Sequence, residues 1–259
     1  MDCAVAGLAA DDGFDAIVKF VSVFYMEFEE IGMSEINHHR RVNDILLGPL
    51  ERPTLKWLAS RMPAWVTPDT CTAVGLLGSL WVTASYILTV YDRNFLWLAS
   101  LGYVVNWLGD SLDGTLARYR RIERPIYGFF VDHIIDAFSV SVIMLGVGLT
   151  PYVNFTIACL TLIAYLLLSV LVFVRTSAVG EFKISYSKLG PTEIRVFAVL
   201  LNTAMYFGGV QTSLGTMDPL RQIPFSPYDA LLIALALLLL SFFLTTAIRE
   251  SIRLAKENK

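Results

Sequence analysis

Charged residues are scarce in this chain of 259 residues. Asp, Glu, Lys and Arg make up only 17% of the sequence, whereas 55% of its residues are hydrophobic. A soluble globular protein of this length needs more polar side chains to cover its surface, and a disordered chain holds far fewer apolar ones. The composition therefore excludes both classes and predicts that most of the surface faces lipid.

Cysteine is also scarce, and the cysteines that are present follow no pattern. They stand at positions 3, 71 and 159, form no CxxC pair, and the last two lie inside apolar segments. Neither a disulfide framework nor a thiolate metal site is therefore expected.

The first residues do not have the pattern expected of a targeting peptide. Residues 1–35 hold eight acidic residues and one base, Lys19, with no basic start and no small-residue cleavage site. Residues 17–28 are apolar but too short to cross a bilayer. We expect residues 1–37 to be an acidic extension of unknown role, followed by a juxtamembrane segment at 38–66.

Long apolar segments are what the sequence has in abundance. A window of about 20 residues, the length that crosses a bilayer, finds six of them. They cover residues 70–91, 94–119, 127–149, 151–174, 191–211 and 227–248. Three of these helices are expected to begin at a hydroxyl residue followed by proline, namely Thr67-Pro68, Thr150-Pro151 and Ser226-Pro227. The sequence predicts an all-α integral membrane protein, with residues 67–259 as one domain of six transmembrane helices.

A shorter amphipathic helix is expected ahead of the first span, in residues 53–62. Leu55, Leu58, Ala59 and Met62 share one face at helical spacing, and Trp57 suits an anchor at the membrane surface. A helix lying in the membrane interface and a helix packed on other parts of the protein fit this pattern equally well.

The basic residues predict the orientation of the chain. With both termini in the cytoplasm, 18 of the 20 Lys and Arg residues lie on the cytoplasmic side, where these residues are retained during insertion. We expect a multi-pass protein of the bacterial cytoplasmic membrane or of an internal membrane.

Four aspartates at membrane depth are the most informative feature. Asp110 and Asp113 belong to the second predicted span, Asp132 and Asp136 to the third, and each costs about 2.5–3.5 kcal/mol to insert. The short connection between these spans makes the helices antiparallel neighbours, so their carboxylate faces can meet. Because carboxylates that meet repel one another, and because hard oxygens favour Mg²⁺ or Mn²⁺, a divalent cation site is expected.

Small residues and a base accompany the first two aspartates. Gly114, Ala117 and Arg118 lie on the same helix face as Asp110 and Asp113. The small residues leave room for a close approach to the backbone, and the guanidinium suits a phosphate. Metal-binding carboxylates with arginine are typical of phosphoryl transfer.

These residues together form a recognisable motif. Residues 110–136 fit the pattern D-x2-D-G-x2-A-R-x9-G-x3-D-x3-D, which resembles the signature of the CDP-alcohol phosphotransferase family. The resemblance implies that an alcohol attacks the β-phosphate of a CDP-linked donor and releases CMP. It further implies four metal ligands holding two Mg²⁺ or Mn²⁺ ions: Asp110, Asp113, Asp132 and Asp136. Asp136 is also the implied general base, and the implied CDP-binding residues are Gly114, Ala117, Arg118 and Gly128.

The acceptor alcohol is harder to predict. Arg175, Lys188 and Arg195 are concentrated on the expected cytoplasmic side and suit an anionic acceptor, with Glu193 beside them. Glu193 fits equally well as a stabilising carboxylate at a helix N-terminus. The run Gly-Pro-Thr-Glu at 190–193 looks like a segment of the choline and ethanolamine phosphotransferase branch, which uses the opposite substrate order.

Several alternatives therefore stay open. We expect CDP-diacylglycerol as the donor, with a CDP-aminoalcohol and diacylglycerol as the alternative pair. A cation transporter that uses the carboxylates is the alternative from another class. His133 is expected in helix packing rather than catalysis, and Asn106 either lines the site or bonds between helices. The expected partners are the CDP-linked donor, the lipid bilayer and a second copy of the chain, with no nucleic acid.

Overall fold

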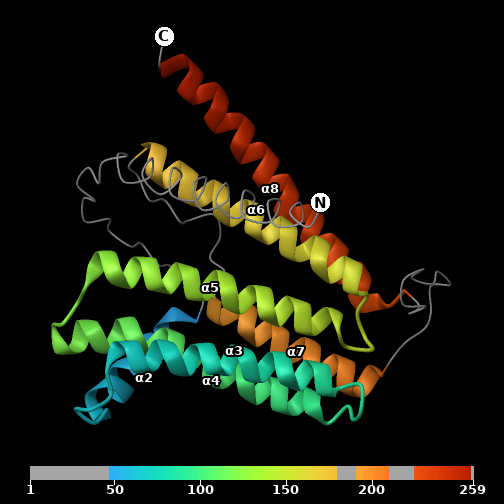
Figure 1. Ribbon diagram of the computed structural model, residues 1–259, viewed down its shortest axis with the longest axis horizontal. Helices are drawn as coiled ribbons and strands as arrows, with labels where there is room; N and C mark the ends of the chain where they lie inside the picture. Colours follow the sequence, from blue (N-terminus) through green and yellow to red (C-terminus); the bar gives the residue numbers. More distant parts are fainter. Residues whose placement is uncertain (1–46, 180–190, 210–224, 258–259) are drawn as a thin grey trace, which may run out of the picture. The chain divides into compact units, whose positions relative to one another are not determined.

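The computed structural model describes residues 47–179, 191–209 and 225–257, which all belong to a unit that begins at Val42. In these ranges the chain is helical and holds no strand (Figure 1). The helices are α2 (Gly48–Arg61), α3 (Pro68–Leu88), α4 (Phe95–Arg120), α5 (Pro125–Gly148), α6 (Phe155–Val179), α7 (Pro191–Gly208) and α8 (Pro227–Glu257). The predicted extension at 1–37 and the predicted acceptor residue Lys188 lie outside the described residues.

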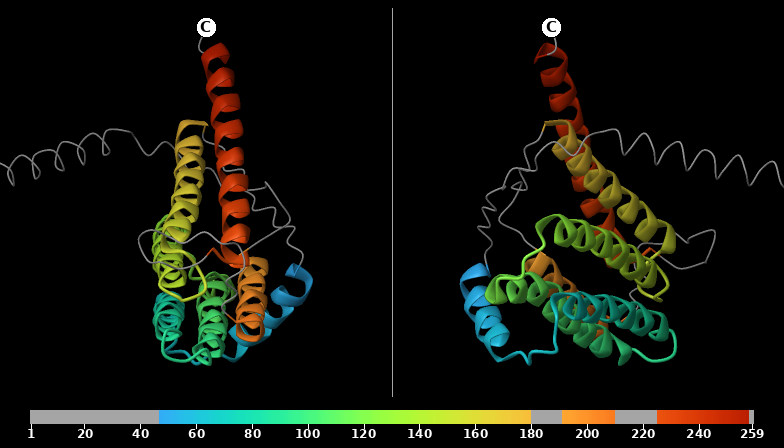
Figure 2. Two further views of the ribbon diagram at one scale, coloured as in Figure 1. Left: turned by 90° about the vertical axis from the view of Figure 1, so that its right-hand side faces the viewer. Right: turned by 60° about the vertical axis from the view of Figure 1, so that its left-hand side comes forward.

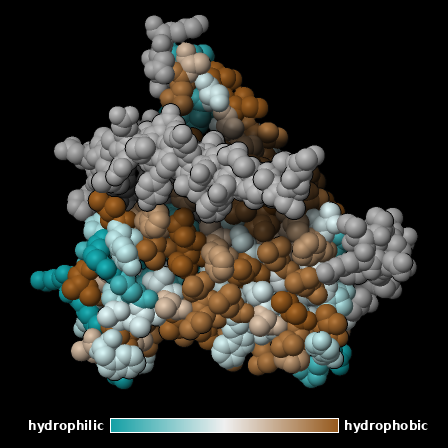
Figure 3. Space-filling view, in the orientation of Figure 1, coloured by the Kyte–Doolittle hydropathy of each residue, from teal (hydrophilic) through white to brown (hydrophobic). Residues whose placement is uncertain are grey.

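Four described helices are long and apolar enough to cross a membrane, namely α3, α5, α6 and α8. The other two predicted spans, α4 and α7, do not meet this criterion. Charged residues, Asp110 and Arg118 among them, occupy the second half of α4, and α7 has only 18 residues, with Glu193 and Arg195 in its first turns. The view in Figure 3 nevertheless shows mostly hydrophobic side chains over the middle of the described helices.

Two of the predicted helix starts are confirmed. The Thr67 hydroxyl accepts from Thr70 N at 3.2 Å, and the Thr70 hydroxyl in turn accepts from Thr67 N at 2.7 Å. Ser226 and Asp229 form the same reciprocal cap at the start of α8, with bonds of 3.1 and 2.8 Å. Both caps supply acceptors for amide groups that have no partner inside the helix.

The third predicted start, Thr150-Pro151, is wrong. The Thr150 hydroxyl donates to Val147 O at 2.6 Å, so this residue closes α5 instead of opening α6. Pro151 lies in a turn, and α6 begins four residues later, where the Asn154 side chain accepts from Thr156 N at 2.9 Å. A hydroxyl before proline suits both a helix start and a turn, and here the turn is formed.

The apolar face of α2 packs on protein. Leu55 and Ala59 are buried and form one cluster with Cys71 of α3 and with Leu112 and Leu116 of α4. The exposed side chain of α2 that was predicted as an anchor, Trp57, lies outside this cluster. The helix is therefore held by α4, and its place at a membrane surface stays a prediction.

Helices α3 and α4 pack closely because glycines line their contact (Figure 2). A Cβ atom on Gly78 would lie 2.5 Å from Asn106 N, and one on Gly109 would lie 2.2 Å from Gly75 N. At this contact Asn106 donates from Nδ2 to Gly75 O and to Ser79 Oγ, both at 2.9 Å. The prediction that Asn106 bonds between helices is thus confirmed, and these contacts fix α4 against α3 where the aspartates begin.

Candidate functional site

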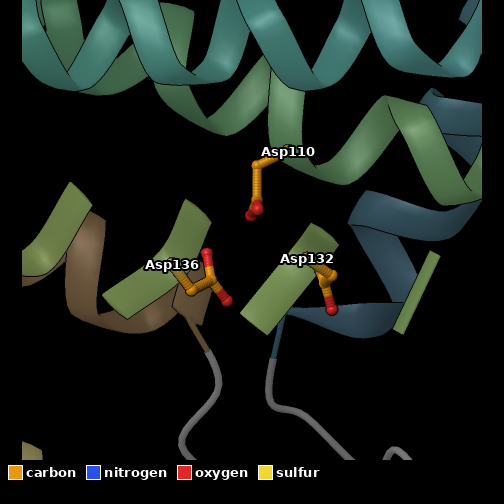
Figure 4. A group of neighbouring side chains, drawn as sticks. All are labelled: Asp110, Asp132 and Asp136. Atoms are coloured by element: carbon orange, nitrogen blue, oxygen red, sulfur yellow. The ribbon is translucent and has the colours of Figure 1, made fainter. Parts of the chain in front are cut away.

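Three of the predicted metal ligands converge between α4 and α5. Asp110 projects from α4 toward the two α5 residues Asp132 and Asp136, which lie one turn apart (Figure 4). One carboxylate oxygen from each lies within 4.8 Å of the others. All three side chains line one pocket, at whose wall α3 contributes Thr72 and Gly75.

The spacing of these carboxylates suits a hard divalent cation. Two oxygens on opposite sides of one Mg²⁺ stand about 4.2 Å apart, and about 5 Å apart on the larger Ca²⁺. The 4.8 Å separation therefore needs only small side-chain movements to bring all three oxygens onto one ion. Since carboxylate oxygens prefer Mg²⁺, Mn²⁺ or Ca²⁺ over soft metals, the residues present could hold such an ion.

The fourth predicted ligand, Asp113, lines the same pocket but is oriented differently. Its Oδ2 accepts from the Thr72 hydroxyl at 2.7 Å, and its Oδ1 accepts from Gly114 N. These bonds turn its carboxylate toward α3, apart from the three converging oxygens. Asp113 therefore joins the wall of the pocket, while its share in a metal site stays a prediction.

Arg195 is tied to the site from α7. Its Nη2 donates to Asp110 Oδ2 at 2.6 Å, and its Nε donates to Asn106 Oδ1 at 2.7 Å. The ion pair is mostly shielded from solvent, with 14% of the Arg195 side chain and 22% of the Asp110 side chain exposed. Arg195 thus supplies positive charge beside the aspartates, and its hydrogen bond fixes the Asp110 carboxylate.

The predicted CDP-binding residues lie where the protein leaves space. For a Cβ atom on Gly114 the nearest atoms would be those of the Arg118 guanidinium, at 3.2 Å, and a Cβ atom on Gly128 would meet nothing within 4 Å. Ala117 closes α4, because its carbonyl accepts from Ile122 N at 3.0 Å. A flat or bulky ligand therefore has access to the backbone at both glycines.

The N-terminus of α5 is tied to that of α3 nearby. Arg124, the residue before α5, forms an ion pair with Asp69 near the start of α3. The hydrogen bond that Arg124 donates to the Asp69 carboxylate raises the pKa of the exposed Arg124 guanidinium. This contact joins the two helix ends beside the open space at Gly128.

Glu193 and Arg175 bond to other parts of the protein, whereas His133 lies beside the site, with its Nδ1 3.7 Å from Asp132 Oδ2. Glu193 is buried at the start of α7, where its carboxylate accepts from Leu47 N at 2.8 Å. Arg175 pairs at 3.0 Å with Glu250 of α8. The His133 ring packs against Phe129 and Phe173, with centroid distances of 4.2 and 5.3 Å, as expected for a packing residue.

A hub of hydrogen bonds around Glu51 joins α2 to α4 and α7, and no pattern in the sequence predicts it. One oxygen of Glu51 accepts from Trp107 Nε1 at 3.0 Å, from Ser111 Oγ at 3.1 Å and from Thr192 Oγ1 at 3.0 Å. The donors come from α4 and α7, so Glu51 joins three helices. No local sequence signal exists for such a hub, because its members are remote in the chain.

Two polar residues of the pocket escaped the sequence analysis. Thr72 is the partner of Asp113 from another helix, and nothing in its own surroundings in the sequence singles it out. Ser139 also lines the pocket. It follows Asp132 by seven residues and Asp136 by three, so the helical period places it on their face and would have found it.

Comparison of the chain with known proteins identifies its family. The family model described as CDP-alcohol phosphatidyltransferase matches residues 65–247. Three curated relatives carry the name cholinephosphotransferase 1. The protein from Xenopus laevis is 32% identical over 96 residues, which are 35% of this chain and 24% of the relative. The protein from Gallus gallus is 31% identical over 107 residues, which are 39% of this chain and 32% of the relative. The protein from Danio rerio is 30% identical over 115 residues, which are 40% of this chain and 29% of the relative.

The two kinds of match differ in how much they cover. The aligned part of this chain spans only about a quarter to a third of the length of these curated relatives. The family model, in contrast, matches most of the chain and includes every helix that contributes to the pocket. The chain therefore belongs to the CDP-alcohol phosphatidyltransferase family.

Proposed function

We propose that this protein is a membrane enzyme of phospholipid synthesis that transfers a phosphoalcohol group from a CDP-linked donor to an alcohol and releases CMP. The observation that carries the proposal is the convergence of Asp110, Asp132 and Asp136 within the region that the family model matches. A site that holds divalent cations and excludes bulk water is suited to phosphoryl transfer.

The aspartates of the pocket and the predicted CDP-binding residues receive roles in this proposal. Asp110, Asp132 and Asp136, with Asp113 beside them, hold Mg²⁺ or Mn²⁺, which when bound neutralises charge on the phosphoryl oxygens. Asp136 accepts the proton of the attacking hydroxyl. The CDP part of the donor occupies the open space at Gly114 and Gly128, next to Ala117, and Arg118 donates to its phosphates.

The order of substrates has two candidates. The names of the curated relatives favour CDP-choline or a similar CDP-aminoalcohol as donor, with diacylglycerol as acceptor. The second candidate is CDP-diacylglycerol with a polar alcohol as acceptor, for which Arg195 and Lys188 supply positive charge. Arg175 and Glu193 complete the residues proposed for the acceptor.

The proposed setting is a bilayer crossed six times. Helices α4 and α7 complete the spans, α2 lies at the membrane surface within residues 38–66, and both termini face the cytoplasm. Residues 67–259 then form the catalytic domain, residues 1–37 form an extension, and two copies of the chain form a homodimer.

Turnover of the purified protein tests this proposal. In detergent with Mg²⁺, it is given CDP-choline with dioctanoylglycerol in one reaction and CDP-diacylglycerol with glycerol 3-phosphate or inositol in another. Release of CMP together with a new phospholipid identifies the substrate order. If the protein unfolds cooperatively, and is therefore folded, but releases no CMP in any reaction, the proposal is overturned.

Substitution of single aspartates separates metal binding from proton transfer. Asp110→Asn, Asp113→Asn and Asp132→Asn are expected to weaken Mn²⁺ and donor binding together, because each removes a ligand charge. Asp136→Asn is expected to lower turnover by about 10² to 10⁴ while leaving much of the donor affinity. Near wild-type turnover in Asp136→Asn contradicts its role as base, and complete loss of donor binding makes it chiefly a metal ligand.

Two further variants complete this set. Arg118→Lys keeps the charge but loses the planar guanidinium, so weaker donor binding is expected with Mn²⁺ binding retained. Asp92→Asn is the matched control, because Asp92 is exposed in the turn between α3 and α4, where its carboxylate accepts from the backbone and side-chain nitrogens of Asn94.

A further inference from the structure

The hydroxyl of Ser139 is buried without a hydrogen-bond partner among the described residues. The residue is 6% exposed, and its Oγ is shielded from solvent. Other serines on these helices donate to the carbonyl four residues earlier, at 2.7–3.3 Å: Ser79, Ser100, Ser141 and Ser169. Ser139 makes no such bond among the described residues.

The position of Ser139 shows where its partner belongs. It lines the same pocket as Asp132 and Asp136, one turn beyond Asp136 along α5. Leaving a buried hydroxyl unsatisfied costs about 1–3 kcal/mol, so such a group in a pocket indicates a ligand with a polar atom at that point. The pocket thus carries a neutral hydrogen-bonding group next to its carboxylates.

We propose that Ser139 binds the reacting hydroxyl of the acceptor alcohol and positions it against Asp136. The inference rests on the proposed transferase function. The acceptor oxygen accepts from Ser139 Oγ while its own proton passes to the Asp136 carboxylate. The acceptor oxygen then forms the new bond to the β-phosphorus, the bond from that phosphorus to the bridging oxygen breaks, and CMP leaves with the bonding electrons.

Two features of the site favour an alcohol over other partners. Ser139 is farther than Asp132 and Asp136 from the connection between α4 and α5, where the predicted donor residues Arg118 and Gly128 lie. A ligand that reaches Ser139 therefore occupies the pocket beyond the donor. A neutral hydroxyl also suits the oxygen of an alcohol better than a further anion, because four carboxylates already line the pocket.

Comparison of Ser139→Ala with Ser141→Ala tests this proposal. Ser141 lies on the same helix, but its hydroxyl is satisfied by Ala137 O at 2.7 Å. Each variant is assayed with dioctanoylglycerol and CDP-choline and with glycerol 3-phosphate and CDP-diacylglycerol. Mn²⁺ affinity from electron paramagnetic resonance and the melting temperature are measured alongside turnover.

Ser139→Ala is expected to raise the KM of the acceptor about 3- to 10-fold, the value of one neutral hydrogen bond. The KM of the donor and the Mn²⁺ affinity should stay unchanged, and the melting temperature should stay equal or rise, because an unsatisfied group has been removed. Ser141→Ala should leave the KM of the acceptor unchanged.

Four results would overturn the inference. An unchanged acceptor KM in Ser139→Ala excludes contact with the alcohol. If Ser139→Ala weakens Mn²⁺ binding but leaves the acceptor KM unchanged, the Ser139 hydroxyl binds a water of the metal site instead of the alcohol. If the variant has a lowered melting temperature and both KM values and the Mn²⁺ affinity change, the role of Ser139 is structural. A wild-type protein without turnover refutes the proposed function itself, and this inference with it.

Discussion

Because α3 and α4 are in close contact at Gly109, we predict that Gly109→Ala destabilises the protein and lowers its turnover. The new Cβ would lie 2.2 Å from Gly75 N, 2.5 Å from Gly75 Cα and 2.6 Å from Cys71 O. Ordinary van der Waals contact begins at 3.4 Å, and all three obstacles are backbone atoms that cannot rotate away. The two helices must therefore move apart by about 1 Å.

The cost of this movement follows from overpacking. Extra atoms in a well-packed interior cost about 1–3 kcal/mol, and more where backbone must move. For a protein of this size each kcal/mol lowers the melting temperature by about 2–4 °C, so a fall of about 3–10 °C is expected. Because Asp110 follows Gly109 directly, a displacement of about 1 Å should also lower turnover by about 10²-fold.

Gly128→Ala is the control for Gly109→Ala, because the same substitution is expected not to lower the melting temperature at this position. Its Cβ meets nothing within 4 Å, and alanine favours a helix over glycine by about 1 kcal/mol. The melting temperature should therefore not fall, although donor affinity should, if the donor occupies this space. Both variants are measured by tryptophan fluorescence during heating in detergent. A wild-type melting temperature for Gly109→Ala would refute the packing argument.

Three further predictions concern contacts between or at the ends of helices. Glu51→Ala leaves three donors on α4 and α7 unsatisfied and should lower the free energy of unfolding by about 3 kcal/mol, measured by denaturant titration, whereas Glu51→Gln should cost less. Arg195→Gln removes a cation that competes with the metal ion for Asp110. It should therefore tighten Mn²⁺ binding severalfold, measured by titration followed by electron paramagnetic resonance, while lowering the melting temperature. Arg121 has a positive φ of 56° at the end of α4, and Arg121→Gly should raise the free energy of unfolding by about 0.5–1 kcal/mol.

Features that repeat along one helix could be predicted from the sequence. Asp132 and Asp136 are four residues apart and must share a face, and the short connection between α4 and α5 places Asp110 opposite them. The caps at Thr67 and Ser226 could likewise be found, because their hydrogen bonds span three residues.

Contacts between helices remote in the chain could not be predicted. Thr72 reaches Asp113 across 41 residues, and Arg195 reaches Asp110 across 85. Which side chains meet in such pairs depends on the axial register of the helices, which the glycine contacts set and which no local pattern encodes. The same limit explains Thr150, whose role as a helix end depends on how the chain turns toward α6.

The charges at the pocket lead to a last prediction, on the order of binding. Its lining includes four carboxylates, and Arg195 is paired with one of them, so with every carboxylate ionised the formal charge of this group is about −3 before any cation binds. A diphosphate donor is repelled by such a pocket, whereas two divalent cations bring the group to about +1 and reverse the sign. Donor affinity measured by calorimetry should therefore rise steeply with Mg²⁺ concentration and vanish in chelator. Donor binding of equal strength with and without Mg²⁺ would show that Arg118 and the backbone at Gly114 suffice to hold the diphosphate, and that the carboxylates act only after it has bound.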